Sequence, residues 1–236
     1  IAEDPLTGEL LDPFRGQADL AANVLRVVDP RTFGDDPLRV LRGAVFAAQF
    51  ALQVDAETDA AIKNTASSLR ELPKSRVGEE WRKLLLRPQQ PSVGLALLMD
   101  WGALSVLHPD FVKLPDTPQN PKWHPEGDVW THTKMAVDEA ASLTRQRQLA
   151  TDERWHVLVA TLCHDLGKAT TTVWERGAWR SPGHDAAGVE PTQRFLRSVS
   201  ADRRTTGIVV PIVRQHLVPL RQSQAAARGT PVTDGS

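Results

Sequence analysis

Apolar residues recur at helical spacing over most of the chain, and this pattern predicts a mainly α-helical protein. After Asp36-Pro37, apolar residues stand three or four positions apart at Leu38, Leu41, Val45 and Ala48, and they should face a core. Aspartate is a good helix N-cap and proline a good first helical residue, so the first clear helix is expected to begin at residues 35–37. Further helices are expected over about 56–69, 75–86, 91–101, 129–146, 152–166, 186–200 and 205–218.

Two segments lack this spacing. Residues 1–33 carry turn signals such as Asp4-Pro5 and are predicted to be non-helical, with one short strand-like run at Leu25–Val28. Residues 113–126 contain four prolines and should form a linker or an ordered loop. A short stretch at 173–179 is a candidate hairpin. We therefore expect three units, namely a non-helical N-terminal remnant (1–33), a helical lobe (34–115) and an all-helical domain (116–236).

Composition places the chain among ordinary globular proteins. Of its 236 residues, 41% are apolar and 24% charged, and the formal net charge is −1. A global basic field for nucleic acid is absent, although a local basic patch remains open. Cys163 is the one cysteine, so no internal disulfide can form. With no apolar run of about 20 residues and no signal peptide, we expect a cytoplasmic protein without a membrane span. The first residue, Ile1, suggests a fragment.

Histidines carry the clearest chemical signal. The doublet His164-Asp165 stands inside an apolar helical pattern, with His132 upstream and His184 and His216 downstream on other predicted helices. Any one histidine alone is more often a helix cap or a half-buried residue, but the doublet and the later Gly-His-Asp favour a shared metal site. Imidazole and carboxylate ligands suit Mn, Fe, Co, Ni, Mg or Zn, and such ions activate water and bind phosphate oxygens. The pattern predicts phosphate-ester hydrolysis.

Several neighbouring residues are secondary candidates. Lys168 is a possible phosphate anchor, with a solvated lysine at a helix end as the alternative. His124 precedes the site and is a candidate lining residue, and Asp185 is a candidate ligand, orienting group or helix cap. Cys163 is expected to be a small buried residue. Two remaining histidines are expected to be structural, His108 and His156.

These motifs resemble the HD superfamily of metal-dependent phosphohydrolases, and the resemblance extends to one family. The segment His124–Thr133 is similar to the beginning of the HD domain appended to bacterial CCA-adding tRNA nucleotidyltransferases. Asp12–Leu20 resembles the last strand region of that family's nucleotidyltransferase head. Asp35–Arg42 resembles its Glu-Asp-x-x-Arg neck motif, with Asp35 in place of glutamate. The resemblance covers about residues 10–220.

The resemblance implies a role for each part of the chain. Residues 1–33 would be the end of the head, 34–115 a neck and body, and 116–236 an HD domain. In the neck motif, Asp36 and Arg39 would template CTP or ATP through base-edge hydrogen bonds, with Arg42 beside them. The alternative is that Asp36 only caps a helix and that both arginines are solvated. The implied metal ligands are His132, His164, Asp165 and His184, with His216 as a further candidate, and the implied catalytic residues are His164, Asp165 and Lys168.

The sequence departs from the family in two places. Nucleotidyl transfer needs paired carboxylates, which the family supplies from a Gly-rich motif and an Asp-x-Asp strand that residues 1–33 do not contain. No aspartate suited to be the last HD ligand follows His216, since Asp234 lies in the polar tail, so a single metal or a missing ligand is expected.

Three hypotheses follow from the sequence. The first is a metal-dependent phosphohydrolase that acts on 2′,3′-cyclic nucleotides, RNA 3′-ends such as those of tRNA, or phosphate monoesters. The second is a fragment of a CCA-adding (or CC- or A-adding) tRNA nucleotidyltransferase whose catalytic head is absent from this chain. The third is a nucleotide- or tRNA-binding module with a degenerate metal site. The sequence does not fix the oligomeric state.

Overall fold

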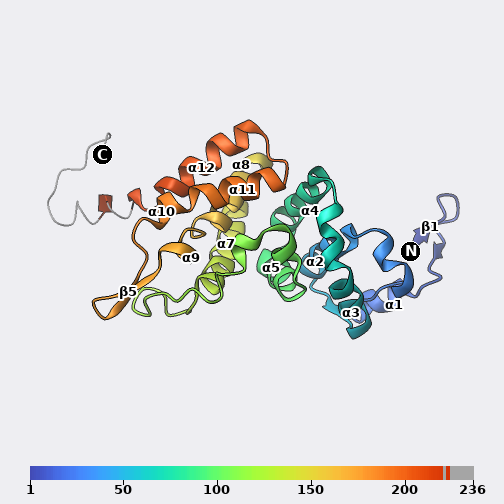
Figure 1. Ribbon diagram of the computed structural model, residues 1–236. Coiled ribbons are helices and arrows are strands. Elements are labelled where there is room, and N and C mark those ends of the chain that lie inside the picture. Colours follow the sequence, from blue (N-terminus) through green and yellow to red (C-terminus); the bar gives the residue numbers. More distant parts are fainter. Residues whose placement is uncertain (220–221, 224–236) are drawn as a thin grey trace.

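Helices dominate the structure, as the hydrophobic spacing predicts. The computed structural model describes residues 1–219 and 222–223, and Figure 1 shows the two halves of the chain at opposite ends of an elongated molecule. The N-terminal half contains β1 (Ala2–Glu3), β2 (Leu10–Leu11), α1 (Gly16–Ala21), β3 (Val24–Leu25), the 3-10 helix η1 (Pro30–Asp35), α2 (Leu38–Phe50), β4 (Gln53–Val54), α3 (Ala56–Thr65), η2 (Ala66–Glu71), α4 (Lys74–Leu86), α5 (Pro91–Asp100), α6 (Ala103–Leu107) and η3 (Pro109–Phe111).

The C-terminal half carries the long helices of the metal-site prediction. Its elements are α7 (Val129–Gln146), α8 (Thr151–Cys163), α9 (Lys168–Thr171), β5 (Val173–Glu175), β6 (Ala178–Arg180), α10 (His184–Ala187), α11 (Val189–Ser198) and α12 (Arg203–Gln215). The strands form small two-stranded pairs. β1 pairs antiparallel with β2, β3 pairs parallel with β4, and β5 pairs antiparallel with β6.

Aspartate side chains begin three of these helices. Asp55 accepts a hydrogen bond of 2.8 Å from the Thr58 backbone N–H at α3, and Asp128 does the same for Thr131 at α7. At α12, Asp202 accepts from the Thr205 N–H at 2.7 Å. Each carboxylate satisfies a backbone donor that the first helical turn leaves free. The helices therefore start where short local signals place them.

The structure corrects three local predictions. Residues 1–33 contain a helix, α1, whose residues are exposed or half-buried, so no apolar stripe announced it. The helix expected over 186–200 is two helices, α10 and α11, which meet at Gly188. The helix expected through residue 166 ends at Cys163, so the His164-Asp165 doublet lies at the helix end and in the turn that follows.

One continuous cluster of buried apolar side chains runs through the described residues. The predicted core positions Leu38, Leu41, Val45 and Ala48 all belong to the buried set, with exposures of 8% or less. Helix α2 packs on α4 and α5, α5 on α7, and α8 on α7, α4 and α12. The α5–α7 and α4–α8 contacts cross the predicted domain boundary near residue 115, so the buried core is continuous across it. The boundary itself stays a prediction from the sequence.

The proline-rich segment between the halves is an ordered loop. The backbone N–H of Val129 donates to the Thr117 carbonyl oxygen at 3.1 Å, and the Gln119 side chain donates to the Asp128 carbonyl at 3.1 Å. These bonds fold the loop back onto the start of α7. Among the described residues, no helix is long and apolar enough to cross a membrane.

Candidate metal centre

Five side chains from four separate segments converge in the C-terminal half. Asp165, in the turn after α8, is 2% exposed and lies at their centre. The four surrounding histidines come from the first turn of α7, the end of α8, the start of α10 and the end of α12: His132, His164, His184 and His216. The structure therefore brings together every metal ligand that the sequence predicts.

The Nε2 atoms of all four imidazoles face the Asp165 carboxylate. On the Oδ2 side, His164 Nε2 lies at 3.0 Å and His132 Nε2 at 3.8 Å. On the Oδ1 side, His184 Nε2 lies at 3.3 Å and His216 Nε2 at 3.9 Å. The ligand atoms form two overlapping groups of three, each with mutual distances within 4.8 Å, and Asp165 belongs to both. This spacing suits one cation or a bridged pair.

Backbone carbonyl oxygens hold three of these rings by their other nitrogen. The Nδ1 atoms of His164, His184 and His216 each lie 2.7 Å from the carbonyl oxygen three residues earlier in the chain. A carbonyl only accepts, so each Nδ1 carries the proton. In the neutral tautomer this leaves the Nε2 lone pairs aimed at Asp165, which is the arrangement found in histidines that bind a metal.

One contact is unfavourable without a cation. The Nε2 atoms of His184 and His216 lie 3.2 Å apart, although both rings place their proton on Nδ1, so two lone pairs face each other in the neutral state. A divalent ion between them would remove this repulsion, and the imidazole–carboxylate donor set fits such an ion.

The electrostatics of the centre agree with this chemistry. Burial works to raise the pKa of Asp165, but the charge on His164 holds it well below its ordinary value. Burial works to lower the pKa of His164, but the neighbouring Asp165 carboxylate raises it overall. The Asp165 carboxylate and His164 thus each favour the charged form of the other, and a cation would compete with a proton for the His164 nitrogen.

Glu126 is a residue of this cluster that the sequence analysis did not single out. Its Oε1 accepts from His132 Nδ1 at 2.7 Å and from His124 Nδ1 at 2.9 Å, and the rings of the two histidines are 4.7 Å apart. Burial alone would raise the pKa of Glu126, but hydrogen bonds, including those from the two histidines, lower it to about 2. Glu126 thus fixes the ring of His132, and its position two residues after His124 in the quoted motif was the available signal.

Lys168 is buried, so the solvated alternative is wrong. Its Nζ lies 2.8 Å from Asp165 Oδ2 and donates to Gln119 Oε1 at 2.7 Å, and its side chain is 10% exposed. Gln119 in turn donates to the Asp128 carbonyl, so the loop before α7 holds the lysine in place. Lys168 lies at the start of α9 rather than at a helix C-terminus, and its charge belongs to the centre.

Gly167 permits the close approach that places His184. Its amide lies near the backbone of Gly188, and a Cβ at residue 167 would collide with the His184 carbonyl oxygen and the Gly188 amide nitrogen. The turn after α8 and the short helix α10 can therefore touch through their backbones. This contact brings His184 within reach of Asp165.

The other candidates lie outside this convergence. Asp185 follows His184 in α10 and belongs to none of the His/Asp/Glu groups found among the described residues. Cys163 is fully buried, and burial raises the pKa of its thiol, as expected of a packing residue. His108 and His156 are buried and bond to Ser198 and Thr205, away from the centre. Asp234 lies outside the described residues.

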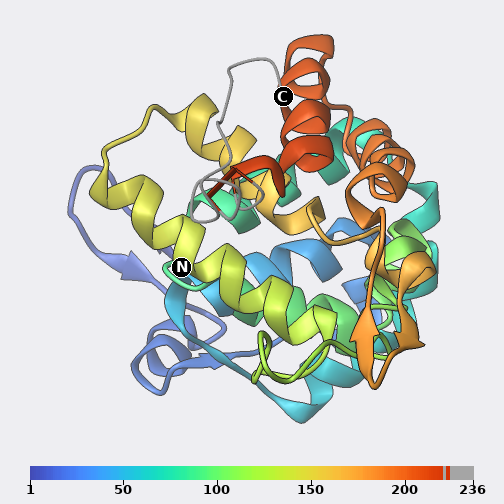
Figure 2. The same cartoon turned by 90° about the vertical axis from the view of Figure 1, so that its left-hand side faces the viewer.

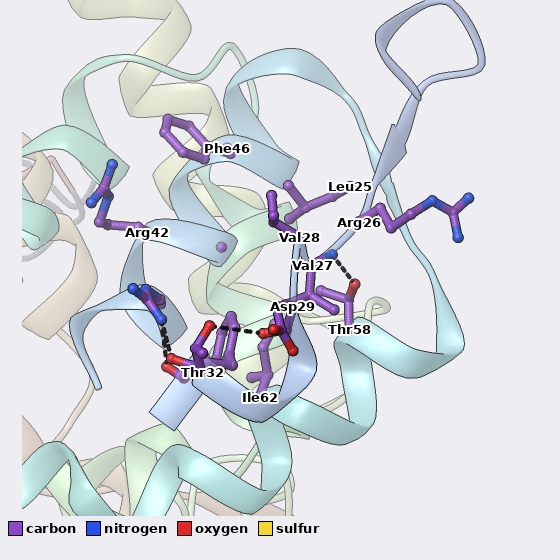
Figure 3. Close-up of a pocket in the computed structure, with 13 residues that line it drawn as sticks. Leu25, Arg26, Val27, Val28, Asp29, Thr32, Arg42, Phe46, Thr58 and Ile62 are labelled. Atoms are coloured by element: carbon purple, nitrogen blue, oxygen red, sulfur yellow. Dashed lines mark hydrogen bonds between the residues drawn. The ribbon is translucent and has the colours of Figure 1, made fainter. Parts of the chain in front are cut away.

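The predicted nucleotide readers are divided between two environments. Arg39 and Arg42 line a pocket of about 390 Å³ between β3, η1, α2 and α3, where Arg42 lies over the Phe46 ring at 5.8 Å (Figure 3). Arg39 is held by the carbonyl oxygens of Thr32 and Phe33. Asp36 does not line this pocket, because its carboxylate pairs with Arg76 at 3.0 Å and accepts from the Leu38 N–H.

The chain is similar in sequence to an RNA-binding family and to a CCA protein. Residues 51–114 match the family described as the probable RNA and SrmB-binding site of polymerase A. The "Multifunctional CCA protein" of Halorhodospira halophila (strain DSM 244 / SL1) is 39% identical over 222 residues, which cover 92% of this chain and 50% of that protein. The chain is homologous to this CCA protein. It spans half the length of that curated relative.

Solved structures agree on the fold. A tRNA-processing enzyme complex superimposes with a TM-score of 0.57 at 20% identity, over 93% of this chain and 51% of that one. The apo form I of a CCA-adding enzyme gives 0.57 at 15% identity, over 95% and 45%. A tRNA nucleotidyltransferase complexed with a primer tRNA and an incoming ATP analogue gives 0.52 at 20% identity, over 96% and 56%. The chain therefore shares the mainly α fold of these enzymes.

Proposed function

We propose that this chain is the helical, RNA-holding half of a CCA-adding tRNA nucleotidyltransferase. The observation that carries this proposal is the 39% identity to a multifunctional CCA protein along 92% of the chain. The match of residues 51–114 to an RNA-binding family supports it. The carboxylates for nucleotidyl transfer would belong to a head absent from this chain, since residues 1–33 supply no such pair.

The pocket at Arg39 and Arg42 supports a nucleotide-binding role for this half. Two guanidinium groups and the Phe46 ring offer charge and a stacking surface to a nucleoside triphosphate. Asp36, paired with Arg76, would have to exchange that partner before it could read a base edge. We therefore assign nucleotide contact to Arg39 and Arg42. Asp36 could contact a base only after its ion pair with Arg76 had broken.

Binding and incorporation assays test this function together. The chain should bind tRNA lacking its 3′ CCA more tightly than a hairpin RNA of equal length, and it should incorporate no labelled CTP. Arg42→Ala should weaken CTP binding, while Arg70→Ala, which removes an exposed arginine that does not line this pocket, should not. Equal affinity for both RNAs would contradict the proposal, as would CTP incorporation by this chain alone.

A second function is favoured by the metal centre itself. We infer that the C-terminal half is an HD-type metal-dependent phosphohydrolase acting on 2′,3′-cyclic nucleotides, RNA 3′-ends or phosphate monoesters. His132, His164, Asp165, His184 and His216 would hold the ion. A divalent cation in such a site supplies Lewis-acid activation of water and of a phosphoryl oxygen.

The chain's own residues orient and charge this site. Glu126 fixes His132, and the three backbone carbonyls fix the other rings, so little ordering is needed when ligands bind. Lys168 places a positive charge beside Asp165 and also lines the groove that opens next to the centre, where it can stabilise charge on phosphoryl oxygens.

Hydrolysis of 2′,3′-cAMP with Ni, Mn, Co or Mg tests this second function. Turnover should require metal and should vanish in His164→Ala. His156→Gln is the matched control, because His156 is a buried histidine that bonds to Thr205 and takes no part in the centre. Undiminished turnover in His164→Ala would refute the assignment. Bound metal without turnover in the unmodified chain would instead indicate a binding module with a degenerate centre.

A further inference from the structure

We propose that a groove beside the metal centre is a binding site for the base and phosphate of an RNA 3′-end, with Trp123 and Trp179 as stacking surfaces. This inference rests on the proposed phosphohydrolase function and assigns the residues that would hold the base of its substrate. It predicts that the centre acts on nucleotides in preference to phosphate esters that carry no base.

The groove lies between two segments that are distant in the sequence. Its volume is about 690 Å³, within the range of pockets that hold a small-molecule ligand. The loop before α7 forms one wall with Asn120 and Trp123, and the β5–β6 hairpin forms the other with Trp179 and Arg180. Figures 1 and 2 both show this loop running beside the hairpin.

The groove opens directly onto the metal centre. His184, a candidate ligand, and Lys168, which contacts Asp165, are both buried and both line it. A phosphate at that end of the groove would reach the centre while the rest of a nucleotide lay between the two walls. The candidate metal centre and the two walls of the groove could therefore contact the same nucleotide.

The hairpin holds Trp179 in a fixed position. Trp174 and Trp179 are directly paired across the strands, with ring centroids 5.1 Å apart and planes at 72°. The two-residue turn places Arg176 at φ 53° and Gly177 at φ 75°, the left-handed pair of a type I′ turn that matches the twist of the strands. A ring fixed in this way loses little freedom when a base stacks on it.

Trp123 on the opposite wall is unusually open to solvent. It is 71% exposed, although a large aromatic ring gains free energy by burial. Lys122 Nζ lies 5.2 Å from its ring centre, which adds positive charge at the mouth of the groove. An exposed ring next to a cation, on a groove that a second tryptophan also lines, offers the combination of stacking surface and positive charge that proteins use to bind single-stranded nucleic acid.

The charges of the groove suit an anionic ligand. Arg180 forms no ion pair with any described residue, so its guanidinium is available to a phosphate. Glu175 is the one carboxylate among the lining residues, and it lies 3.5 Å from Arg176. Asn120 adds a side-chain amide whose N–H groups can donate to a base or a ribose, while its Oδ1 accepts from the Lys122 N–H.

Binding to the chelator-treated protein tests the groove without any turnover. The probe is a fluorescein-labelled RNA trinucleotide, followed by anisotropy. Trp123→Ala and Trp179→Ala should each weaken binding roughly 5- to 100-fold, the range expected for the loss of one stacked base. Trp179→Phe should recover most of the affinity. Phe50→Ala, which truncates an exposed aromatic residue in the N-terminal half, is the control and should change nothing.

Kinetics then separate this inference from the proposed function. With metal added, both tryptophan variants should raise KM for 2′,3′-cAMP and leave hydrolysis of glycerol 2-phosphate unchanged. If both esters are cleaved and neither variant alters trinucleotide affinity, the stacking site is wrong while the phosphohydrolase stands. If neither ester is cleaved, the phosphohydrolase fails, and the anisotropy data still decide whether the groove binds RNA. Equal loss of both activities would show that the substitutions damage the centre itself.

Discussion

Protonation of His108 should destabilise the protein below about pH 6.5. The His108 ring is buried where the two halves meet, 5.0 Å from the Trp81 ring on α4 and 4.9 Å from the Phe195 ring on α11. Its Nδ1 lies 3.1 Å from Ser198 Oγ, and its Nε2 has no hydrogen-bond partner among the described residues. Burial lowers the pKa of His108 from 6.5 to about 3, with only partial opposition from Asp110.

The sign and size of the effect follow from linkage. Above pH 6.5 both states are neutral, and His108 contributes no pH dependence. Below it, the unfolded chain takes up a proton that the folded protein refuses until about pH 3, so the free energy of unfolding falls as the pH falls. The loss reaches about 2 kcal/mol at pH 5 and about 4 kcal/mol near pH 3, at about 1.36 kcal/mol per pH unit between the two pKa values.

Urea unfolding of the native chain and of His108→Gln at pH 7.5 and pH 5 measures this loss. The variant lacks the aromatic packing and should be less stable at pH 7.5. The gap between the two proteins should then shrink by about 2 kcal/mol at pH 5, because only the native chain carries the titrating group. Other titrating groups, including those of the metal centre, are common to both proteins and cancel in the comparison. A gap that stays constant between the two pH values would refute the reasoning.

Two further substitutions probe the metal centre. Gly167→Ala should abolish metal binding, measured by calorimetry with Mn or Ni, because the added Cβ collides with the His184 backbone, whereas Gly207→Ala, where nothing lies within 4 Å, should leave it intact. Glu126→Gln should weaken metal affinity roughly 10- to 100-fold, because the carboxylate that orients His132 is lost, and an unchanged affinity would exclude this orienting role.

The local elements could be read from the sequence because their causes are local. Asp128 caps α7 through an N–H three residues away, and α7 has the predicted bounds of 129–146. The β5–β6 hairpin follows from Gly177 in its turn and the paired tryptophans. Helix α1 escaped prediction because it buries no residue, and periodicity reports only the side of a helix that faces a core.

At the two candidate sites, the sequence does not predict which side chains contact one another. In the neck segment, the sequence places Asp36 and Arg39 three residues apart, but Asp36 precedes α2 and pairs with Arg76, which lies 40 residues later. At the candidate metal centre, the sequence singled out the four converging histidines and Asp165, but not Glu126 or Gln119. Their roles depend on contacts with His132 and Lys168 across the loop and are invisible in the residue types alone.

The sequence by itself determined most of the helices and their aspartate caps at α7 and α12, because each depends on groups within a few residues. Only the tertiary structure decided that the rings of His164, His184 and His216 meet at Asp165. That meeting requires α8 to pack against α7 and α12, and it requires a glycine at residue 167 to let two backbones touch. Such contacts depend on how whole helices pack. The hydrophobic effect is non-directional, so the close packing of side chains across the entire core determines which helices lie together.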